Sequence, residues 1–158
     1  MSKIKKYIFL DFNGVIIPKK PKDVRNGSWF NVSTHAIKQL NRLVAFTGAE
    51  VVVSSNWRLM CSTDTLRTLL EDVGFCGQVA GKTPDLYEYR NGGFTGSRHD
   101  EITDWLGVNI PMHADCRYVI LDDRSDALLS KNKSFFQCNS THGLTHKVVN
   151  KAIAHLNS

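Results

Sequence analysis

Short apolar runs rich in β-branched and aromatic residues alternate with amphipathic helical stretches along this chain. The strand predictions cover residues 7–10, 50–54 and 117–121, with weaker ones at 79 and 135–137. The predicted helices begin after the cap residues Ser33, Ser62, Ser97 and Thr145. Strands that alternate with helices of this length form a mainly parallel sheet covered on both faces. The pattern therefore predicts a Rossmann-like, three-layer α/β/α fold.

The length and composition fit one domain. The chain has 158 residues, of which 42% are hydrophobic, and a domain of about 150 residues buries roughly 68–70% of its unfolded surface. We predict a single domain over residues 1–158, with a flap or loop over 14–32 and a long loop over 81–97. The apolar runs are much shorter than the roughly 18 residues of a membrane-spanning helix, and the four cysteines are irregularly spaced. We therefore expect a cytoplasmic protein with reduced thiols and no membrane partner.

Polar residues follow three of the predicted strands at the point where each strand ends. Asp11 follows the first strand, Ser54 and Ser55 follow the second, and Asp122 and Asp123 follow the third. Because the carboxyl ends of parallel strands share one edge of the sheet, we expect these groups to converge there. Mg²⁺ binds in proteins through one or two carboxylates together with water and substrate phosphate. The sequence thus predicts a Mg²⁺ site that also receives a phosphorylated ligand.

Three motifs carry a family resemblance: residues 9–16 (FLDFNGVI), 51–56 (VVVSSN) and 118–123 (YVILDD). They resemble the first, second and fourth motifs of the haloacid dehalogenase (HAD) superfamily, whose members are mostly phosphatases with an aspartate nucleophile. With segments 81–84, 98–102 and 143–145, their order is similar to that of the small phosphatase-like domains of bacterial and phage RNA-repair proteins. The resemblance covers nearly the whole chain and implies a HAD-like fold.

The resemblance implies a role for each motif residue. Asp11 would attack phosphorus and form an aspartyl-phosphate. Ser55 would donate a hydrogen bond to a phosphoryl oxygen, with Ser54 as the alternative. Arg98, at the start of a predicted helix, stands in the place of the basic third motif and would neutralise charge on the transferring group. Lys82 is the alternative residue for that role.

The expected cofactor is Mg²⁺. The resemblance implies that Asp11, Asp122 and the backbone carbonyl of Asn13 would bind the ion. Either Asp123 or Asp126 would act as a second carboxylate ligand or orient the metal-bound waters.

Asn13 departs from the motif. Phosphatases of the superfamily have an aspartate two residues after the nucleophile, which serves as general acid and general base. An asparagine side chain hydrogen-bonds but cannot exchange that proton, and loss of such help typically costs roughly 10²–10⁴-fold in rate. Two interpretations fit. Either the chain is a natural variant that is a slow phosphatase, a phosphotransferase or a silent phosphate- or RNA-binding domain, or the asparagine was introduced to trap a complex in an active enzyme.

The substrate prediction depends on what surrounds the motifs. Neither residues 13–50 nor residues 56–97 leave room for a full cap domain beside their predicted core elements, so an open site suited to phosphate on a macromolecule is expected. The net charge of +5 is typical of partners that are polyanionic or phosphorylated, and equally of a solvated basic surface. The candidate substrate contacts are Ser54, Asn56, Arg58 and Lys82, and Trp57 would either stack on a base or pack in the core. We predict action on phosphorylated RNA or DNA ends, with a small phosphate monoester as the alternative substrate.

Overall fold

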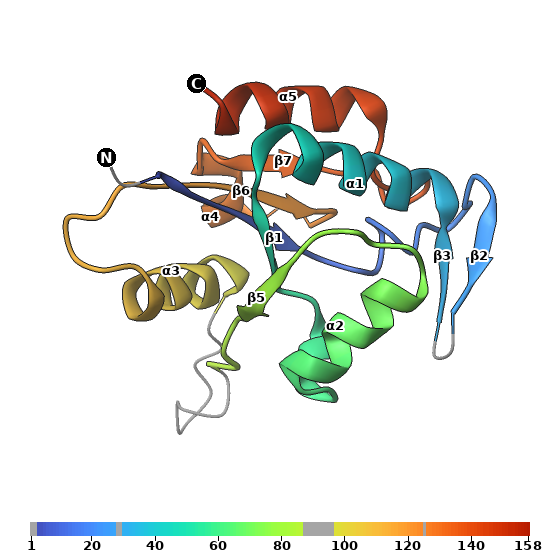
Figure 1. Cartoon of the computed structure of the whole chain (residues 1–158), viewed down its shortest axis with the longest axis horizontal. Helices are drawn as coiled ribbons and strands as arrows, with labels where there is room; N and C mark the ends of the chain where they lie inside the picture. Colours follow the sequence, from blue (N-terminus) through green and yellow to red (C-terminus); the bar gives the residue numbers. More distant parts are fainter. Residues whose placement is uncertain (1–2, 28–29, 87–96, 125) are drawn as a thin grey trace.

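Five parallel strands form the central sheet of the computed structural model, which describes residues 3–27, 30–86, 97–124 and 126–158 (Figure 1). The strand order is β5-β4-β1-β6-β7. The strands are β1 (Lys5–Leu10), β4 (Glu50–Val53), β5 (Val79–Lys82), β6 (Cys116–Asp122) and β7 (Phe135–Gln137). From β1 the chain runs outward to β4 and β5, and it then returns to the other side of β1 to form β6 and β7. In α/β sheets, ligands bind beyond the carboxyl ends of the strands at such a switch point.

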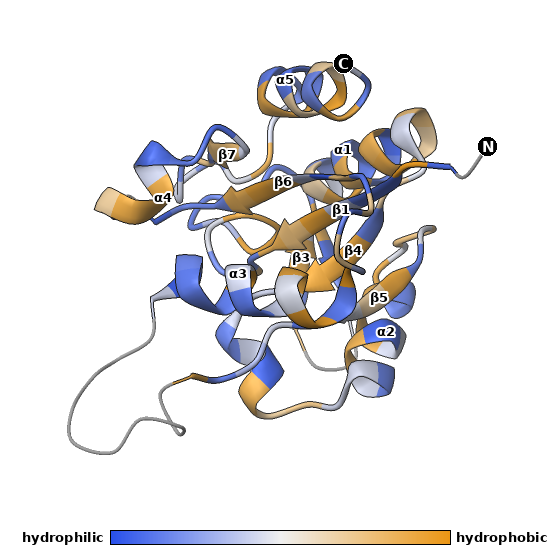
Figure 2. Cartoon of the chain, turned by 90° about the vertical axis from the view of Figure 1, so that its left-hand side faces the viewer, coloured by the Kyte–Doolittle hydropathy of each residue, from blue (hydrophilic) through white to orange (hydrophobic). Residues whose placement is uncertain are grey.

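Helices cover both faces of this sheet, which confirms the predicted three-layer α/β/α class. The helices are α1 (Thr34–Thr47), α2 (Thr63–Asp72), α3 (Arg98–Asn109), α4 (Ala127–Lys131) and α5 (His146–Leu156). Alternate residues of β1 serve the two faces: Ile8 and Leu10 pack with α1, α2 and α5, whereas Tyr7 and Phe9 pack with α3 and α4. Figure 2 shows the hydrophobic strands enclosed between the helices.

Side-chain caps start the helices where the sequence predicts them. The Oγ atom of Ser33 accepts a hydrogen bond from the Ala36 N–H, and α1 ends at Gly48 in the left-handed conformation, with φ of 71°. Ser97 and Asp100 form a reciprocal capping box at the start of α3. This box places Arg98 in the first helical position of α3, at the edge of the sheet where the parallel strands end.

Several short elements differ from the prediction. Strands β2 (Val24–Asn26) and β3 (Asn31–Ser33) pair as an antiparallel hairpin in the region predicted as a flap or loop. A single 3₁₀ turn, η1 (Asn56–Leu59), follows β4. The long loop predicted over 81–97 begins later, because Gly81 and Lys82 continue the ladder of β5 beside β4, and residues 87–96 of that loop lie outside the described residues. No helix within the described part of the chain is both long enough and apolar enough to cross a bilayer.

Candidate active site

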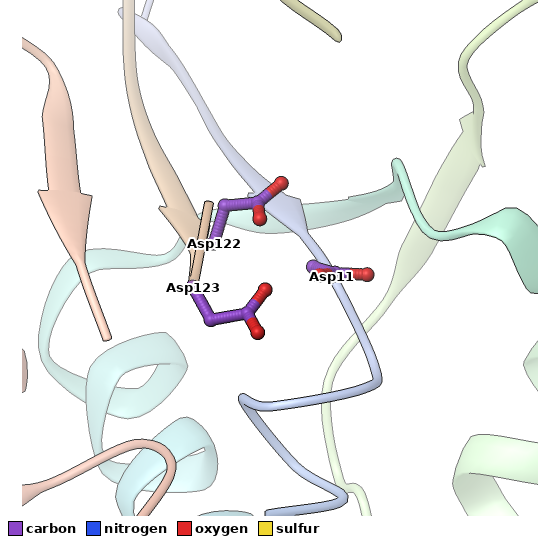
Figure 3. A group of neighbouring side chains, drawn as sticks. All are labelled: Asp11, Asp122 and Asp123. Atoms are coloured by element: carbon purple, nitrogen blue, oxygen red, sulfur yellow. The ribbon is translucent and has the colours of Figure 1, made fainter. Parts of the chain in front are cut away.

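Three carboxylates meet at the carboxyl ends of β1 and β6. Asp11 follows β1, Asp122 ends β6, and Asp123 comes directly after it. One carboxylate oxygen from each residue lies within 4.8 Å of the other two (Figure 3). A hydrogen bond of 3.0 Å from the Asp11 N–H to the Leu121 carbonyl joins the two strand ends. Asp11 and Asp122 are buried and Asp123 is half-buried, so the strand ends hold three acidic groups close together, two of them with little access to water.

Arg98 lies in ionic contact with two of these carboxylates. Its Nη1 atom lies 3.1 Å from Oδ2 of Asp122 and 3.4 Å from Oδ1 of Asp11, and the arginine is only 4% exposed. These are ionic contacts without hydrogen-bond geometry: Nε and Nη1 of Arg98 and Oδ2 of Asp122 have no hydrogen-bond partner among the described residues. Buried polar atoms that lack partners are uncommon, and a bound ion or water is one way in which such atoms are satisfied.

The pKa values of the carboxylates reflect incomplete charge compensation. Burial, followed by the repulsion from Asp122, raises the pKa of Asp11 to about 7, against the lowering effect of Arg98. Burial also raises the pKa of Asp122, although Arg98 lowers it. Arg98, together with Arg124 at Asp122, therefore does not offset the burial of the two carboxylates. Hard carboxylate oxygens are the ligands that Mg²⁺ prefers, and a divalent cation would supply the missing positive charge, so this donor set fits Mg²⁺.

A pocket of about 190 Å³ opens above the carboxylates. The described residues that line it are Asp11, Asn13, Asn56, Arg98, Asp123 and Arg124. A larger pocket of about 360 Å³ lies between β5 and α3, but none of the three clustered carboxylates lines it. We therefore place the candidate site in the smaller pocket, because two of the clustered carboxylates, those of Asp11 and Asp123, line it.

Arg124 is a pocket residue that the motifs did not predict. It is exposed, it lines the pocket, and its backbone N–H donates a 2.9 Å hydrogen bond to Oδ1 of Asp122. The sequence feature that could have predicted Arg124 is its position directly after the acidic motif. Asn13, which was predicted, also lines the pocket and is exposed, in a tight turn closed by a 2.9 Å hydrogen bond from the Gly14 N–H to the Ile17 carbonyl.

The two serines after β4 have different environments, although both are buried. The Oγ atom of Ser55 accepts a 3.3 Å hydrogen bond from the Trp57 N–H and so caps the turn η1. The Oγ atom of Ser54 has no hydrogen-bond partner among the described residues. Ser54 therefore has a wholly unpaired hydroxyl, whereas Ser55 uses its Oγ as an acceptor and keeps its O–H to donate. Neither serine is among the described residues that line the pocket.

Three other predicted site residues make their contacts elsewhere. Arg58 is buried and pairs with Glu101 at 2.5 Å. Nζ of Lys82 donates hydrogen bonds to the carbonyls of Arg58 and Cys61, at 3.0 and 2.9 Å. Asp126 caps α4, with Oδ1 accepting a 2.8 Å hydrogen bond from the Leu129 N–H. The described lining of the pocket does not include any of the three.

Trp57 packs in the core. Its ring centroid lies 5.0 Å from that of Phe30 and 6.3 Å from that of Phe12. This partly buried indole belongs to the larger of the two hydrophobic clusters. Of the two predicted roles for Trp57, the structure therefore supports packing.

Comparison with known families agrees with this geometry. A family model described as the HAD domain in Swiss Army Knife RNA repair proteins matches residues 7–149. The chain belongs to this family. The HAD resemblance is thereby confirmed, and the matched range contains Asp11, Arg98 and the acidic pair at the end of β6. Comparison with curated proteins and with solved structures found no match. Membership in this HAD family supports a phosphatase-related role in RNA repair.

Proposed function

We propose that this HAD domain is a Mg²⁺-dependent phosphatase that acts through an aspartyl-phosphate at Asp11 on phosphorylated nucleic-acid ends. The observation that carries the proposal is the buried group of Asp11, Asp122 and Asp123 with Arg98 3.1–3.4 Å from two of them. Asp11, Asp123 and Arg98 line one small pocket and Asp122 contacts Arg98, an arrangement that would bring a nucleophile, metal ligands and a cation for phosphate together.

Asp11, Asp122 and Asp123 would hold the Mg²⁺, with the backbone carbonyl of Asn13 as a further oxygen ligand. When bound, the metal would offset negative charge and so allow an anionic phosphate to approach an anionic nucleophile. A carboxylate oxygen of Asp11 would form a bond to phosphorus while the bond from phosphorus to the leaving oxygen breaks. Arg98 would stabilise the negative charge on the transferring group. Water would then attack the aspartyl-phosphate, releasing phosphate and restoring the carboxylate.

Asn13 limits this reaction in our proposal. It stands where the superfamily has its general acid and base, and an amide neither protonates the leaving oxygen nor deprotonates the attacking water. Solvent would have to exchange both protons, and we expect turnover slowed by roughly 10²–10⁴-fold. The same residue favours a second candidate function, a phosphate- or RNA-binding HAD domain without turnover.

Three features support a nucleic-acid end as substrate. The family is one of RNA-repair proteins, the chain carries a net charge of +5, and the exposed Arg124 lines the same pocket as the buried Arg98. A terminal phosphate next to Arg98 would leave Arg124 free to contact an adjacent phosphodiester.

The test compares Asn13→Asp with Asn56→Asp, which adds the same charge to the same pocket at a position without an acid–base role. Mg²⁺-dependent phosphate release is measured from 5′- and 3′-phosphorylated RNA and DNA and from small phosphate esters. We expect Asn13→Asp to raise turnover of the oligonucleotides by roughly 10²–10⁴-fold, Asn56→Asp to give no increase, and Asp11→Asn to abolish the gain. Phosphate binding without release by either form would favour the silent binding domain. Turnover of small esters alone would favour the small-molecule phosphatase.

A further inference from the structure

A buried ion pair joins three segments of the chain, two of which, η1 and α3, also carry the pocket residues Asn56 and Arg98. Nη2 of Arg58, in η1, lies 2.5 Å from Oε2 of Glu101, in the first turn of α3, and the two side chains are 4% and 7% exposed. Arg58 also donates to the Ser55 carbonyl, at 3.0 Å, and to the Pro84 carbonyl, at 3.5 Å. The Leu86 N–H donates to Glu101 at 3.4 Å. The pair thereby ties the turn after β4 and the segment after β5 to the start of α3.

Stability alone accounts poorly for this pair. Removing two charges from water costs several kcal/mol per ion, and apolar replacements of buried pairs are often neutral or stabilising. Burial raises the pKa of Glu101 even though Arg58 lowers it, so the attraction does not fully offset the loss of solvent. The location of the pair is therefore a better guide to its role than its contribution to the free energy of folding.

Glu101 lies three residues after Arg98 in α3, and residues at this spacing lie on the same side of a helix. The Arg98 guanidinium is held by its ionic contacts with Asp11 and Asp122, and no described hydrogen bond reaches its Nε or Nη1. Its position therefore also depends on where the first turn of α3 is fixed. The bond from Arg58 to the Ser55 carbonyl fixes the turn that carries the unpaired Ser54 hydroxyl. A second cation supports the same turn, because Nζ of Lys82 donates to the Arg58 carbonyl.

We propose that Arg58 and Glu101 are positioning residues, which hold Arg98 and the Ser54–Ser55 turn at the distance from Asp11 that phosphoryl transfer requires. Neither residue would touch the substrate. The proposal rests on the function proposed above. It also gives Arg58 a different role from the phosphate contact predicted from the sequence.

The test uses Glu101→Gln, which keeps the shape of the side chain and removes its charge, in the Asn13→Asp background. The control is Val149→Ala, which opens a small cavity in α5 away from the pocket and so lowers stability without altering the pair. Both variants are assayed on 5′- and 3′-phosphorylated RNA oligonucleotides at the same interval below their Tm. A misplacement of about 1 Å can cost on the order of 10²-fold, so we expect Glu101→Gln to lower kcat about 10- to 100-fold, with a smaller change in KM. Val149→Ala should keep the parent kcat.

The second readout does not need turnover. The Nε–Hε resonance of Arg98 in ¹⁵N-labelled protein, identified by its loss in Arg98→Lys, should shift in Glu101→Gln and stay in place in Val149→Ala. If Glu101→Gln does not fold, the double variant Arg58→Met with Glu101→Met takes its place, because it leaves no unpaired buried charge. An unchanged Arg98 resonance overturns the proposal, as does a kcat equal to that of Val149→Ala. If the Asn13→Asp parent releases no phosphate, the proposed function fails, and the Arg98 resonance alone decides whether the pair positions the site.

Discussion

Gly14 and Asp123 are in direct contact: a Cβ atom added to Gly14 would overlap the carboxylate of Asp123. The φ angle of Gly14 is +81°, a conformation that residues with a side chain rarely adopt. Glycine at this position of the first motif is therefore required by the contact with Asp123 as well as by the backbone conformation of the turn. It leaves the space in which Asp123 approaches Asp11 and Asp122.

Gly14→Ala should displace Asp123 and weaken Mg²⁺ binding. Gly48→Ala is the matched control, since Gly48 has a similar φ of +71° but, among the described residues, its added Cβ would meet only the Nζ atom of Lys3, at 3.8 Å. Both variants should lose about 1–3 kcal/mol of folding free energy from backbone strain. Only Gly14→Ala should also lose the rise in Tm that Mg²⁺ produces, measured by thermal unfolding with and without the metal. An equal Mg²⁺ response in the two variants would contradict this role of Gly14.

Proton binding and Mg²⁺ binding should compete at Asp11. Without metal, burial and Asp122 raise the pKa of Asp11 to about 7 from an ordinary value of 3.8. The folded protein then holds a proton that the unfolded chain releases, so the unfolding free energy of the metal-free protein should fall as pH rises from about 4 to about 7 and then level off. The rise in Tm caused by Mg²⁺ should be larger near pH 8 than near pH 6.

Chemical unfolding across this pH range, with and without Mg²⁺, measures both effects. Asp11→Asn should remove the part of the pH dependence of the unfolding free energy that comes from Asp11 in the metal-free protein. Asp126→Asn should preserve it, because Asp126 caps α4 outside the carboxylate group and asparagine is an equally good cap. A pH dependence that Asp11→Asn leaves unaltered would assign the proton to another residue.

Ser54→Ala and Ser55→Ala should separate phosphate binding from stability. Ser55→Ala removes the cap of η1 and should cost about 0.5–2 kcal/mol in urea unfolding. Ser54→Ala removes a buried hydroxyl without a described partner, so stability should stay level or rise, while the affinity for phosphate in the presence of Mg²⁺ should fall. A fall in phosphate affinity in Ser55→Ala alone would contradict this prediction and support the role that the family resemblance gives to Ser55.

Arg124→Ala should weaken the binding of a phosphorylated RNA oligonucleotide and make it less dependent on salt. When a protein neutralises one phosphate fewer on a single strand, the slope of log K against log salt becomes shallower by about 0.7. Lys5→Ala is the control, because Lys5 is exposed at the start of β1, at the opposite end of the parallel strands from the pocket. Fluorescence anisotropy over a series of salt concentrations gives both slopes. Identical slopes for Arg124→Ala and the parent would exclude an interaction between Arg124 and the RNA backbone.

The features that depend on residues close together in the sequence were predictable. The caps at Ser33 and Ser97 were correct because a cap is a hydrogen bond across three residues. The convergence of Asp11 with Asp122 followed from strand-end position, since parallel strands bring their carboxyl ends to one edge. The hairpin of β2 and β3 was missed, because strands of three residues are too short for periodicity to distinguish from a loop.

The sequence by itself determined the α/β class, the family and the position of the acidic group, because periodicity, caps and motif order are encoded locally. Only the tertiary structure decided which charged and polar side chains face the pocket. Arg58 follows the second motif and Arg98 begins the segment 98–102, yet Arg58 pairs with Glu101 and Arg98 faces the carboxylates. The physical reason is that burial and pairing depend on residues distant in the chain: Glu101 lies 43 residues after Arg58, and no local pattern records that contact.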